Sequence, residues 1–81
     1  MTETTNLKQT LVDIAKAIVD QPDEVVVNVI EEDNLITLVL SVAPDDMGMV
    51  IGRHGRIAKA IRSLIKAAAC NINKKVNVEI K

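Results

Sequence analysis

The beginning of the chain carries apolar residues at intervals of three or four, the spacing of one helical face. The positions are Leu7, Leu11, Ile14, Ala15 and Ile18. They predict a helix over residues 7–19, because Pro22 disfavours helical angles in the residue before it. We expect Asn6 to cap the first turn of this helix, with Gln9 at the reciprocal position of a capping box.

Two apolar runs rich in β-branched residues follow and predict a hairpin. Residues 24–31 (EVVVNVIE) and residues 35–42 (LITLVLSV) each have the composition of a strand. The polar residues 32–34 between them are few enough for a tight connection. Pro44 ends the second strand, because proline cannot donate to a strand ladder.

A short helix is expected after the hairpin. Asp45 or Asp46 is placed to cap its first turn, where an acid suits the positive end of the helix dipole. The helix then runs through Met47 and Val50. Gly52 is placed to end it in a left-handed conformation.

A longer helix begins after Gly55 and ends near Asn71 and Asn73. Its apolar residues at helical spacing are Ile57, Ile61, Leu64, Ile65 and Ala68. The last residues alternate apolar and polar, as in a strand with one buried face, and the apolar ones are Val76, Val78 and Ile80. The order α-β-β-α-α-β predicts an α+β fold, and a chain of 81 residues is expected to form one domain, 1–81.

Composition changes this picture in two ways. The chain is 48% hydrophobic but contains no aromatic residue, so the core must be aliphatic and no ring can stack on a base. The net charge of −1 conceals a separation of charge along the chain. Residues 1–46 carry ten acidic and two basic groups, whereas residues 47–81 carry eight basic groups and one acidic group. This asymmetry favours a polyanionic partner, and a dipolar surface that only aids solubility is the alternative.

Several classes of protein are disfavoured. The longest apolar stretch, residues 35–43, is too short and too polar to span a bilayer, and we expect no signal peptide, no membrane contact and a cytoplasmic location. Cys70 is the only cysteine and is expected to be a buried, inert thiol. The chain offers no nucleophile–base pair, no cluster of metal ligands and no Gly-Lys-Ser/Thr pattern, so we expect no enzyme, no metal and no cofactor.

Two glycines, Gly52 and Gly55, bracket Arg53 and His54 between the two later helices. A turn this tight needs residues that tolerate unusual φ angles and have no Cβ in the way. We expect its amides, and those of the next helical turn, to lack internal acceptors and to lie beside the positive end of a helix dipole. A phosphate is the natural acceptor there, and Arg53 and Arg56 add charge that fits phosphate oxygens. A simple spacer turn is the alternative.

Basic residues three to four positions apart extend this charge along the following helix. They are Arg56, Lys59, Arg62 and Lys66. A groove between this helix and the second strand of the hairpin would be apolar inside and basic at its edge, which suits single-stranded nucleic acid. Candidates for that groove, or for the core beneath it, are Val50, Ile51, Ile57, Leu38 and Leu40. A solvated basic face is the alternative.

With this element order and the segment 48–62 (GMVIGRHGRIAKAIR), the chain resembles a type II KH domain, with a three-stranded sheet packed against three helices. More narrowly, it resembles the small bacterial single-KH proteins of the KhpA family over essentially its whole length. In KH domains the Gly-x-x-Gly loop clamps about four nucleotides by their backbone. The resemblance thus implies RNA contacts at Val50, Ile51, Gly52, Arg53, His54, Gly55, Arg56, Lys59 and Arg62. Ala58 stands where many KH domains have a large aliphatic residue, so the groove departs from the usual shape.

The resemblance also implies a role. The expected function is binding of single-stranded RNA, as an RNA chaperone or post-transcriptional regulator. The expected partners are a second copy of the chain or a larger KH protein of the KhpB (Jag-like) type, a pair linked in some bacteria to cell shape and cell-wall organisation. The alternative is a KH dimerisation or assembly subunit that binds RNA weakly by itself. Changing Arg53 and His54 to Asp separates the two, since it removes RNA binding in the first case and alters the oligomeric state in the second.

Overall fold

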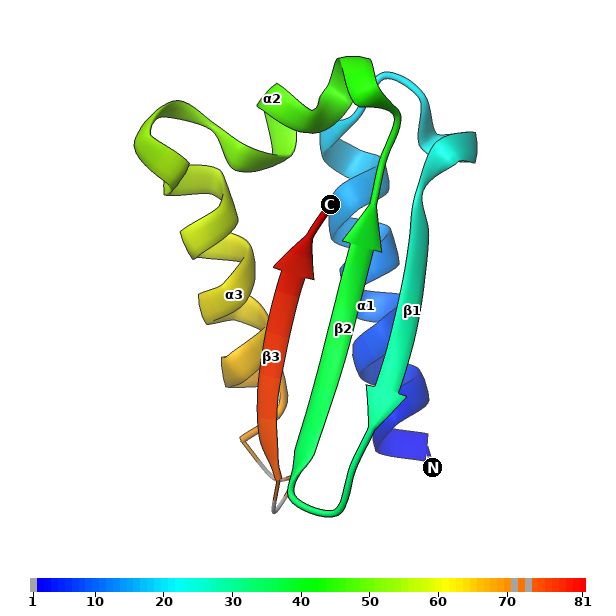
Figure 1. Ribbon diagram of the computed structural model, residues 1–81, viewed down its shortest axis with the longest axis vertical. Coiled ribbons are helices and arrows are strands. Elements are labelled where there is room, and N and C mark those ends of the chain that lie inside the picture. The colour runs from blue at the N-terminus through cyan, green and yellow to red at the C-terminus, as the bar shows by residue number, and fades with distance from the viewer. Residues whose placement is uncertain (1, 71, 73) are drawn as a thin grey trace.

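Helices and strands of a computed structural model follow the predicted order α-β-β-α-α-β (Figure 1). The structure describes residues 2–70, 72 and 74–81. The helices are α1 (Thr2–Ile18), α2 (Met47–Ile51) and α3 (Arg56–Ala68), and the strands are β1 (Val26–Glu31), β2 (Leu35–Ser41) and β3 (Lys75–Ile80). Short 3₁₀ turns occupy Pro22–Glu24 (η1), Pro44–Asp46 (η2) and Arg53–Gly55 (η3).

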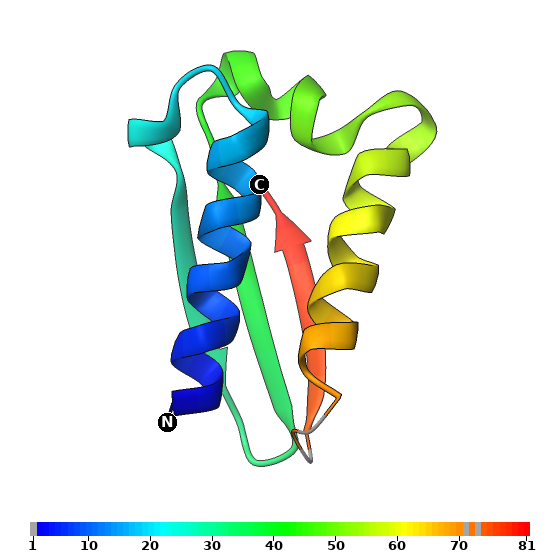
Figure 2. The same ribbon diagram turned by 180° about the vertical axis from the view of Figure 1, so that it is seen from behind.

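The three strands form one mixed sheet in the order β1-β2-β3. Strand β2 pairs antiparallel with β1 and parallel with β3, so that Leu38 lies opposite Val29 on one side and Val78 on the other. A parallel pair needs a long crossover connection, and the segment containing α2 and α3 provides it. Helices α1 and α3 cover the same face of the sheet (Figure 2). The strand β2, which has a neighbour on each edge, is buried from Ile36 to Leu40.

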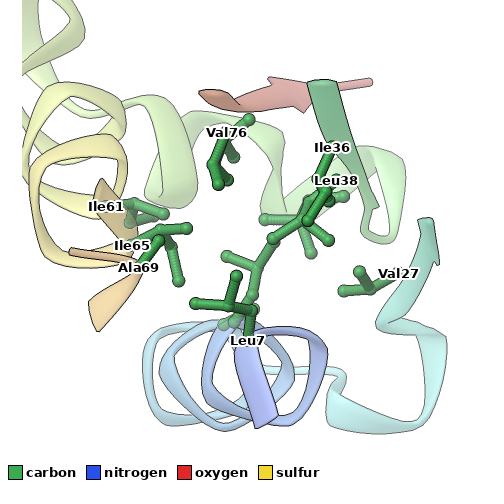
Figure 3. Close-up of a cluster of buried hydrophobic side chains, with 12 residues drawn as sticks. Leu7, Val27, Ile36, Leu38, Ile61, Ile65, Ala69 and Val76 are labelled. Carbon is green, nitrogen blue, oxygen red and sulfur yellow. The ribbon is translucent and has the colours of Figure 1, made fainter. Parts of the chain in front are cut away.

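The core between these two helices and the sheet is aliphatic, as the composition predicts. It consists of Leu7, Leu11, Ala15, Val27, Ile36, Leu38, Leu40, Ile61, Ile65, Ala69, Val76 and Val78. Side chains from α1, α3 and the strands meet in this one cluster (Figure 3). Burial of one such Leu or Ile contributes about 1.5–3 kcal/mol. The core thus fixes α3, and with it the turn that precedes α3, against the sheet.

The first two element boundaries differ from the sequence prediction. Helix α1 begins at Thr2, so Asn6 lies inside it and is not its cap. The Asn6 carbonyl instead accepts a hydrogen bond from the Thr10 hydroxyl (2.8 Å), and the Gln9 side chain donates to Asp13 (2.8 Å). Strand β1 begins two residues late because the amide of Val25 donates to the carbonyl of Pro22 and closes η1 (3.1 Å).

The buried stripe of α3 also differs from the predicted one. Leu64 is 55% exposed and Ala68 is exposed, whereas Ala58 is buried. The stripe that meets the core contains Ala58, Ile61, Ile65 and Ala69, and this spacing leaves Leu64 on the flank of the helix. Cys70, predicted to be buried, is exposed because the helix has already ended. The predicted end markers Asn71 and Asn73 lie outside the described residues.

Candidate nucleic-acid interface

The turn between α2 and α3, at the upper left of Figure 1, begins with a glycine in an unusual conformation. The amide of Gly52 donates to the carbonyl of Gly48 (2.9 Å) and closes α2. The φ of Gly52 is 72°, as its predicted role requires, but its ψ of 178° lies outside the left-handed helical region. This combination is open essentially to glycine alone. The chain therefore leaves α2 extended, along a path that other residues do not adopt.

Space gives a second reason for glycine at position 52. A Cβ built there would lie 2.9 Å from the Cβ of Ile57 and closer still to its Cγ1. Real Cβ atoms do not come this near to other heavy atoms, so Ile57 would have to move. The first turn of α3 thus packs directly on the backbone where the Gly52–Gly55 loop begins.

Two left-handed residues complete the loop. His54 has φ 55° and ψ 25°, and Gly55 has φ 74° and ψ 16°. Histidine is one of the few side chains enriched in this region, whereas most residues are strained by it. A Cβ on Gly55 would meet nothing within 4 Å, so only its φ favours glycine there. The two glycines are therefore required for different reasons.

The expectation that the loop amides have no internal acceptors is wrong for three of them. The amide of Gly55 donates to the carbonyl of Gly52 (3.3 Å), and the amide of Arg56 donates to the carbonyl of Arg53. These two bonds hold the loop as a 3₁₀ turn, and the bond from Gly52 to Gly48 closes α2. The attraction for an anion comes from the N-terminal end of α3, whose dipole is positive there, and from the charged side chains around it.

The charged residues predicted for the site are exposed on one side of this turn. Arg53, His54, Arg56 and Lys59 are all exposed. Helix α3 contains no acidic residue, so it carries no carboxylate to offset this charge. Ile51 and Ile57 are each 38% exposed and flank the loop with apolar surface. The structure thus brings most of the predicted contact residues to the loop as side chains, and Gly52 and Gly55 as backbone.

Val50 is the exception, because it is completely buried. Leu38 and Leu40 are also completely buried and belong to the core. They do not line a groove, because neither has any exposed surface. The prediction that the groove lies beside the second strand is therefore wrong: the strand next to α3 is β3.

Arg62 connects α3 to this edge strand. Its Nε donates to the carbonyl of Val78 (3.2 Å). In a parallel pair, alternate residues direct their backbone groups toward the neighbour; the amide of Lys75 donates to Asn34, just before β2, and that of Lys81 donates to Leu40 of β2. Val78 alternates with these residues, so its backbone groups face the outer edge, where Arg62 meets its carbonyl. Arg62 therefore has a structural contact in addition to its charge.

Asp46 has a role that the sequence did not reveal. It was predicted as a helix cap, but no side-chain capping bond is formed at the start of α2. Its carboxylate is 2% exposed and accepts hydrogen bonds from the amides of Gln21 (3.0 Å) and Asp20 (3.4 Å). It thereby fastens the beginning of α2 to the connection between α1 and β1. Nothing in the sequence separates Asp46 from the exposed Asp45, because the two donors lie about 25 residues away.

A β-α-α-β unit with a Gly-x-x-Gly turn between its helices, preceded by a helix and a strand, is a KH domain. The model of the KhpA/KhpB KH-domain family matches residues 8–80, and the chain belongs to this family. It is not a family of enzymes. Over the described residues, no helix is long and apolar enough to cross a membrane, and no group of three potential metal ligands is found.

Curated relatives match nearly end to end. The chain is 60% identical over 74 residues to the RNA-binding protein KhpA of Clostridium acetobutylicum, which covers 91% of this chain and 99% of that one. It is 60% identical over 67 residues to the protein of the same name from Caldanaerobacter subterraneus, covering 83% of this chain and 89% of that one. It is 45% identical over 74 residues to the RNA-binding protein KhpA of Listeria monocytogenes, covering 91% of this chain and 97% of that one. No solved structure matches the chain.

Proposed function

We propose that the chain is one KH domain, residues 1–81, that binds single-stranded RNA and holds the RNA backbone at the loop from Gly52 to Gly55. The observation that carries the proposal is the conformation of Gly52, which combines a glycine-only backbone with a Cβ position already filled by Ile57. A spacer turn does not need so restricted a residue. The names of the relatives from Clostridium and Listeria, which are RNA-binding proteins, support the same conclusion.

Each residue around the loop has a definite part in this proposal. A phosphate lies at the start of α3, where the helix dipole is positive, and Arg53 and Arg56 contact its oxygens. His54 lies beside the RNA backbone. Lys59 and Arg62 attract the next phosphates, since they follow along the same helix. Gly52 and Gly55 allow the backbone to approach closely.

The bases contact the aliphatic side chains beside the loop. Ile51 and Ile57 are partly exposed, whereas the neighbouring Val50 is completely buried. Because the chain has no aromatic residue, bases gain no ring stacking, which is worth about 1–3 kcal/mol per base in other single-strand binders. We therefore propose modest affinity and weak sequence selectivity.

At the level of the cell, we propose a cytoplasmic RNA chaperone or post-transcriptional regulator. We further propose that it works with a larger KH protein of the KhpB type in the control of cell shape and cell-wall organisation. The family model, which includes KhpA and KhpB, supports a relationship between the two types.

Assembly with a second KH domain is the alternative function, and one observation favours it. Ile57, Ala60 and Leu64 are exposed residues at positions i, i+3 and i+7 of α3, on the flank opposite Arg62. Leu64, at 55% exposure, is the most exposed large apolar side chain of the described residues. A second copy of the chain that packs on this stripe would bury it. Sedimentation of a Leu64→Glu variant tests this: a homodimer becomes monomeric, whereas an unchanged mass excludes the stripe as the interface.

The salt dependence of RNA binding tests the main proposal. If two to four phosphates are neutralised, the logarithm of the association constant falls with the logarithm of the salt concentration with a slope of about −1.4 to −2.8. A slope near zero would show that the RNA backbone is not held by these cations.

A further inference from the structure

Strand β1 forms the edge of the sheet that lies away from α3 (Figure 1). At the opposite edge, the carbonyl of Val78 in β3 already accepts a hydrogen bond from Arg62. Beyond β1 neither view shows another described element, and α1 packs on the face of the sheet (Figure 2). The chain thus has an open strand edge on a side that the proposed RNA site does not use.

The backbone of β1 directs hydrogen-bonding groups toward this open edge. In an antiparallel pair, opposite residues alternate between those that exchange two backbone hydrogen bonds and those that exchange none. Glu32 and Leu35 exchange two, at 2.7 and 3.5 Å. Counted back from this pair along the register with β2, the amides and carbonyls of Val29 and Val27 point outward. Val29 is the more accessible of the two, because it is partly exposed whereas Val27 is 4% exposed.

The middle of β1 has none of the features by which edge strands usually avoid pairing, which are charged side chains, proline and β-bulges. Residues 26–30 (VVNVI) contain no charged residue and no proline. The register with β2 is continuous from Val26 to Glu31, so no bulge bends the strand. The strand can therefore accept another strand along its edge.

Apolar side chains lie on the open face of this strand. Alternate residues of a strand point to opposite faces of the sheet, so Val26 and Ile30 lie on the face opposite α1, with Asn28 between them. Val26 is 49% exposed and Ile30 is 53% exposed. A strand added at the edge would place its own side chains beside these two and remove their apolar surface from water.

The charge around β1 is acidic. Residues 17–52 contain no lysine and no arginine. Exposed acids occur just before and just after the strand, and they are Asp23, Glu24, Glu31, Glu32 and Asp33. Among the described residues, only Glu31 of these five has an ion pair, with Lys74 (2.9 Å). Helix α1 carries two acidic and two basic residues, so it does not change this balance. The edge thus repels RNA and favours a basic partner.

The same acids argue against a second copy of the chain as the partner. An antiparallel pair of two β1 strands would bring Glu24 of each copy toward Glu31 and Glu32 of the other. A parallel pair would bring each acid toward its own counterpart. Like charges that lie opposite one another destabilise a strand pair.

We propose that the edge of β1 binds an extended basic segment of another protein by strand addition. The segment pairs with the backbone of β1 around Val29, places alternate apolar residues beside Val26 and Ile30, and presents lysine or arginine to the acids at both ends of the strand. This docking site goes beyond the proposed RNA binding and does not depend on it. It lets the chain hold a protein on one side while α3 and the Gly52–Gly55 loop hold RNA on the other.

The test uses the probe peptide Lys-Lys-Val-Thr-Val-Thr-Val-Lys-Lys with blocked ends, which reads the same in both directions. Paired along β1, its valines lie beside Val26, Asn28 and Ile30, and its threonines lie opposite Val27 and Val29. The first control peptide has proline in place of threonine, which keeps the charge but cannot donate to the strand. The second has glutamate in place of lysine, which keeps the strand pattern but reverses the charge.

Titration of the ¹⁵N-labelled chain, followed by the shifts of its amide signals, gives both the affinity and the place of binding. We expect the largest shifts in β1 around Val29 and none at Gly52 and Gly55. Both control peptides should bind at least about tenfold more weakly than the probe, because one lacks the backbone donors and the other is repelled.

A pair of variants tests the acids. Glu24→Lys with Glu32→Lys reverses exposed charges at the two ends of β1 and should weaken binding of the probe at least about fivefold. Asp13→Lys with Glu79→Lys makes the same change of charge at exposed positions on α1 and β3 and should bind as the native chain does. Arg53→Asp with His54→Asp, which removes RNA binding in the proposed function, should not weaken binding of the probe.

Four outcomes would overturn the inference. The first is no binding of the probe by the folded native chain. The second is equal binding of the proline peptide, because charge alone then explains the attraction. The third is a set of shifts centred on the loop or on α3. The fourth is protection of the Val29 amide that rises with the concentration of the chain alone, because a second copy then occupies the edge. None of these results bears on RNA binding at the loop.

Discussion

Ile57 occupies the space that a side chain on Gly52 would need, with the Cβ of Ile57 only 2.9 Å from the position of that side chain's first atom. The contact joins the start of the loop to the first turn of α3. The loop is thus held by packing as well as by its hydrogen bonds. Because of this contact, a side chain should destabilise the domain more at Gly52 than at Gly55.

Gly52→Ala should destabilise the domain by roughly 2–4 kcal/mol, because it adds a clash with Ile57 to a strained φ. Gly55→Ala should lower stability by only about 1–2 kcal/mol, because the space around it is open and only the left-handed conformation opposes alanine. Urea unfolding of both variants measures the difference. Equal destabilisation would contradict the assigned role of Ile57.

A double variant separates the two causes at Gly52. In an Ile57→Ala background, the effect of Gly52→Ala should be smaller than in the native chain, because the nearest clashing atom, Cγ1 of Ile57, is gone and only the Cβ contact at 2.9 Å and the strain of φ remain. The measurement is the coupling free energy from a double-mutant cycle. A coupling of zero would show that the contact between the two residues does not oppose the substitution.

His54 should tolerate some substitutions much better than others. Its φ of 55° is accessible to Gly, Asn and Asp but is strongly disfavoured for a β-branched residue. His54→Asn should therefore change the free energy of unfolding by less than about 0.5 kcal/mol, whereas His54→Val should lower it by about 1–2 kcal/mol. Thermal unfolding followed by circular dichroism checks both. A Val variant as stable as the Asn variant would mean that the loop adopts another conformation in solution.

Asp46→Asn should destabilise the domain by about 1–3 kcal/mol, because one oxygen of the buried carboxylate becomes an amide NH₂, which cannot accept the hydrogen bond from the backbone of Asp20 or Gln21. Asp45→Asn removes the same charge at an exposed neighbour and should have an effect within about 0.5 kcal/mol. Denaturant unfolding of the two variants separates the effect of the lost hydrogen bond on stability from the effect of the lost charge. Equal effects would refute the anchoring role of Asp46.

Substitutions of Lys59 and Arg62 should differ in their effect on stability, although both should weaken RNA binding. Lys59→Ala should weaken RNA binding without affecting unfolding, because Lys59 is exposed. Arg62→Ala should weaken binding and also lower stability by about 0.5–1.5 kcal/mol, since the carbonyl of Val78 loses its donor. Parallel anisotropy and unfolding measurements test this. An Arg62→Ala variant with native stability would show that the hydrogen bond to β3 is not maintained in solution.

The elements that follow from periodicity were predictable, and those set by distant contacts were not. Ile61 and Ile65 were correctly placed in the core, because α3 has the spacing of a helix with one buried face. Leu64 was misplaced because it adjoins that face in sequence, and only packing against α1 and β3 decides which flank is covered. The role of Asp46 was missed for the same reason, since its donors lie in the connection between α1 and β1, about 25 residues earlier.

The position of the loop was predictable from its two glycines, but its internal bonds were not. Gly52 and Gly55 indicated a tight turn, and both have positive φ. That the amides of Gly55 and Arg56 are used within the turn depends on the 3₁₀ geometry of η3, for which the residue types alone give no signal. Likewise, the strand beside α3 could not be chosen before the parallel pairing of β2 with β3 was known.

The most direct test of the account is anisotropy with labelled single-stranded RNA, comparing the native chain with an Arg53→Asp, His54→Asp variant. Aspartate tolerates the left-handed conformation of position 54, so the loop should keep its shape, and circular dichroism checks the fold. Asn6→Asp with Lys8→Asp on α1 makes the same change of charge at exposed positions away from the loop and serves as the control. The account predicts that the native chain and the control bind RNA and that the loop variant does not. A folded loop variant that binds as tightly as the native chain would contradict it.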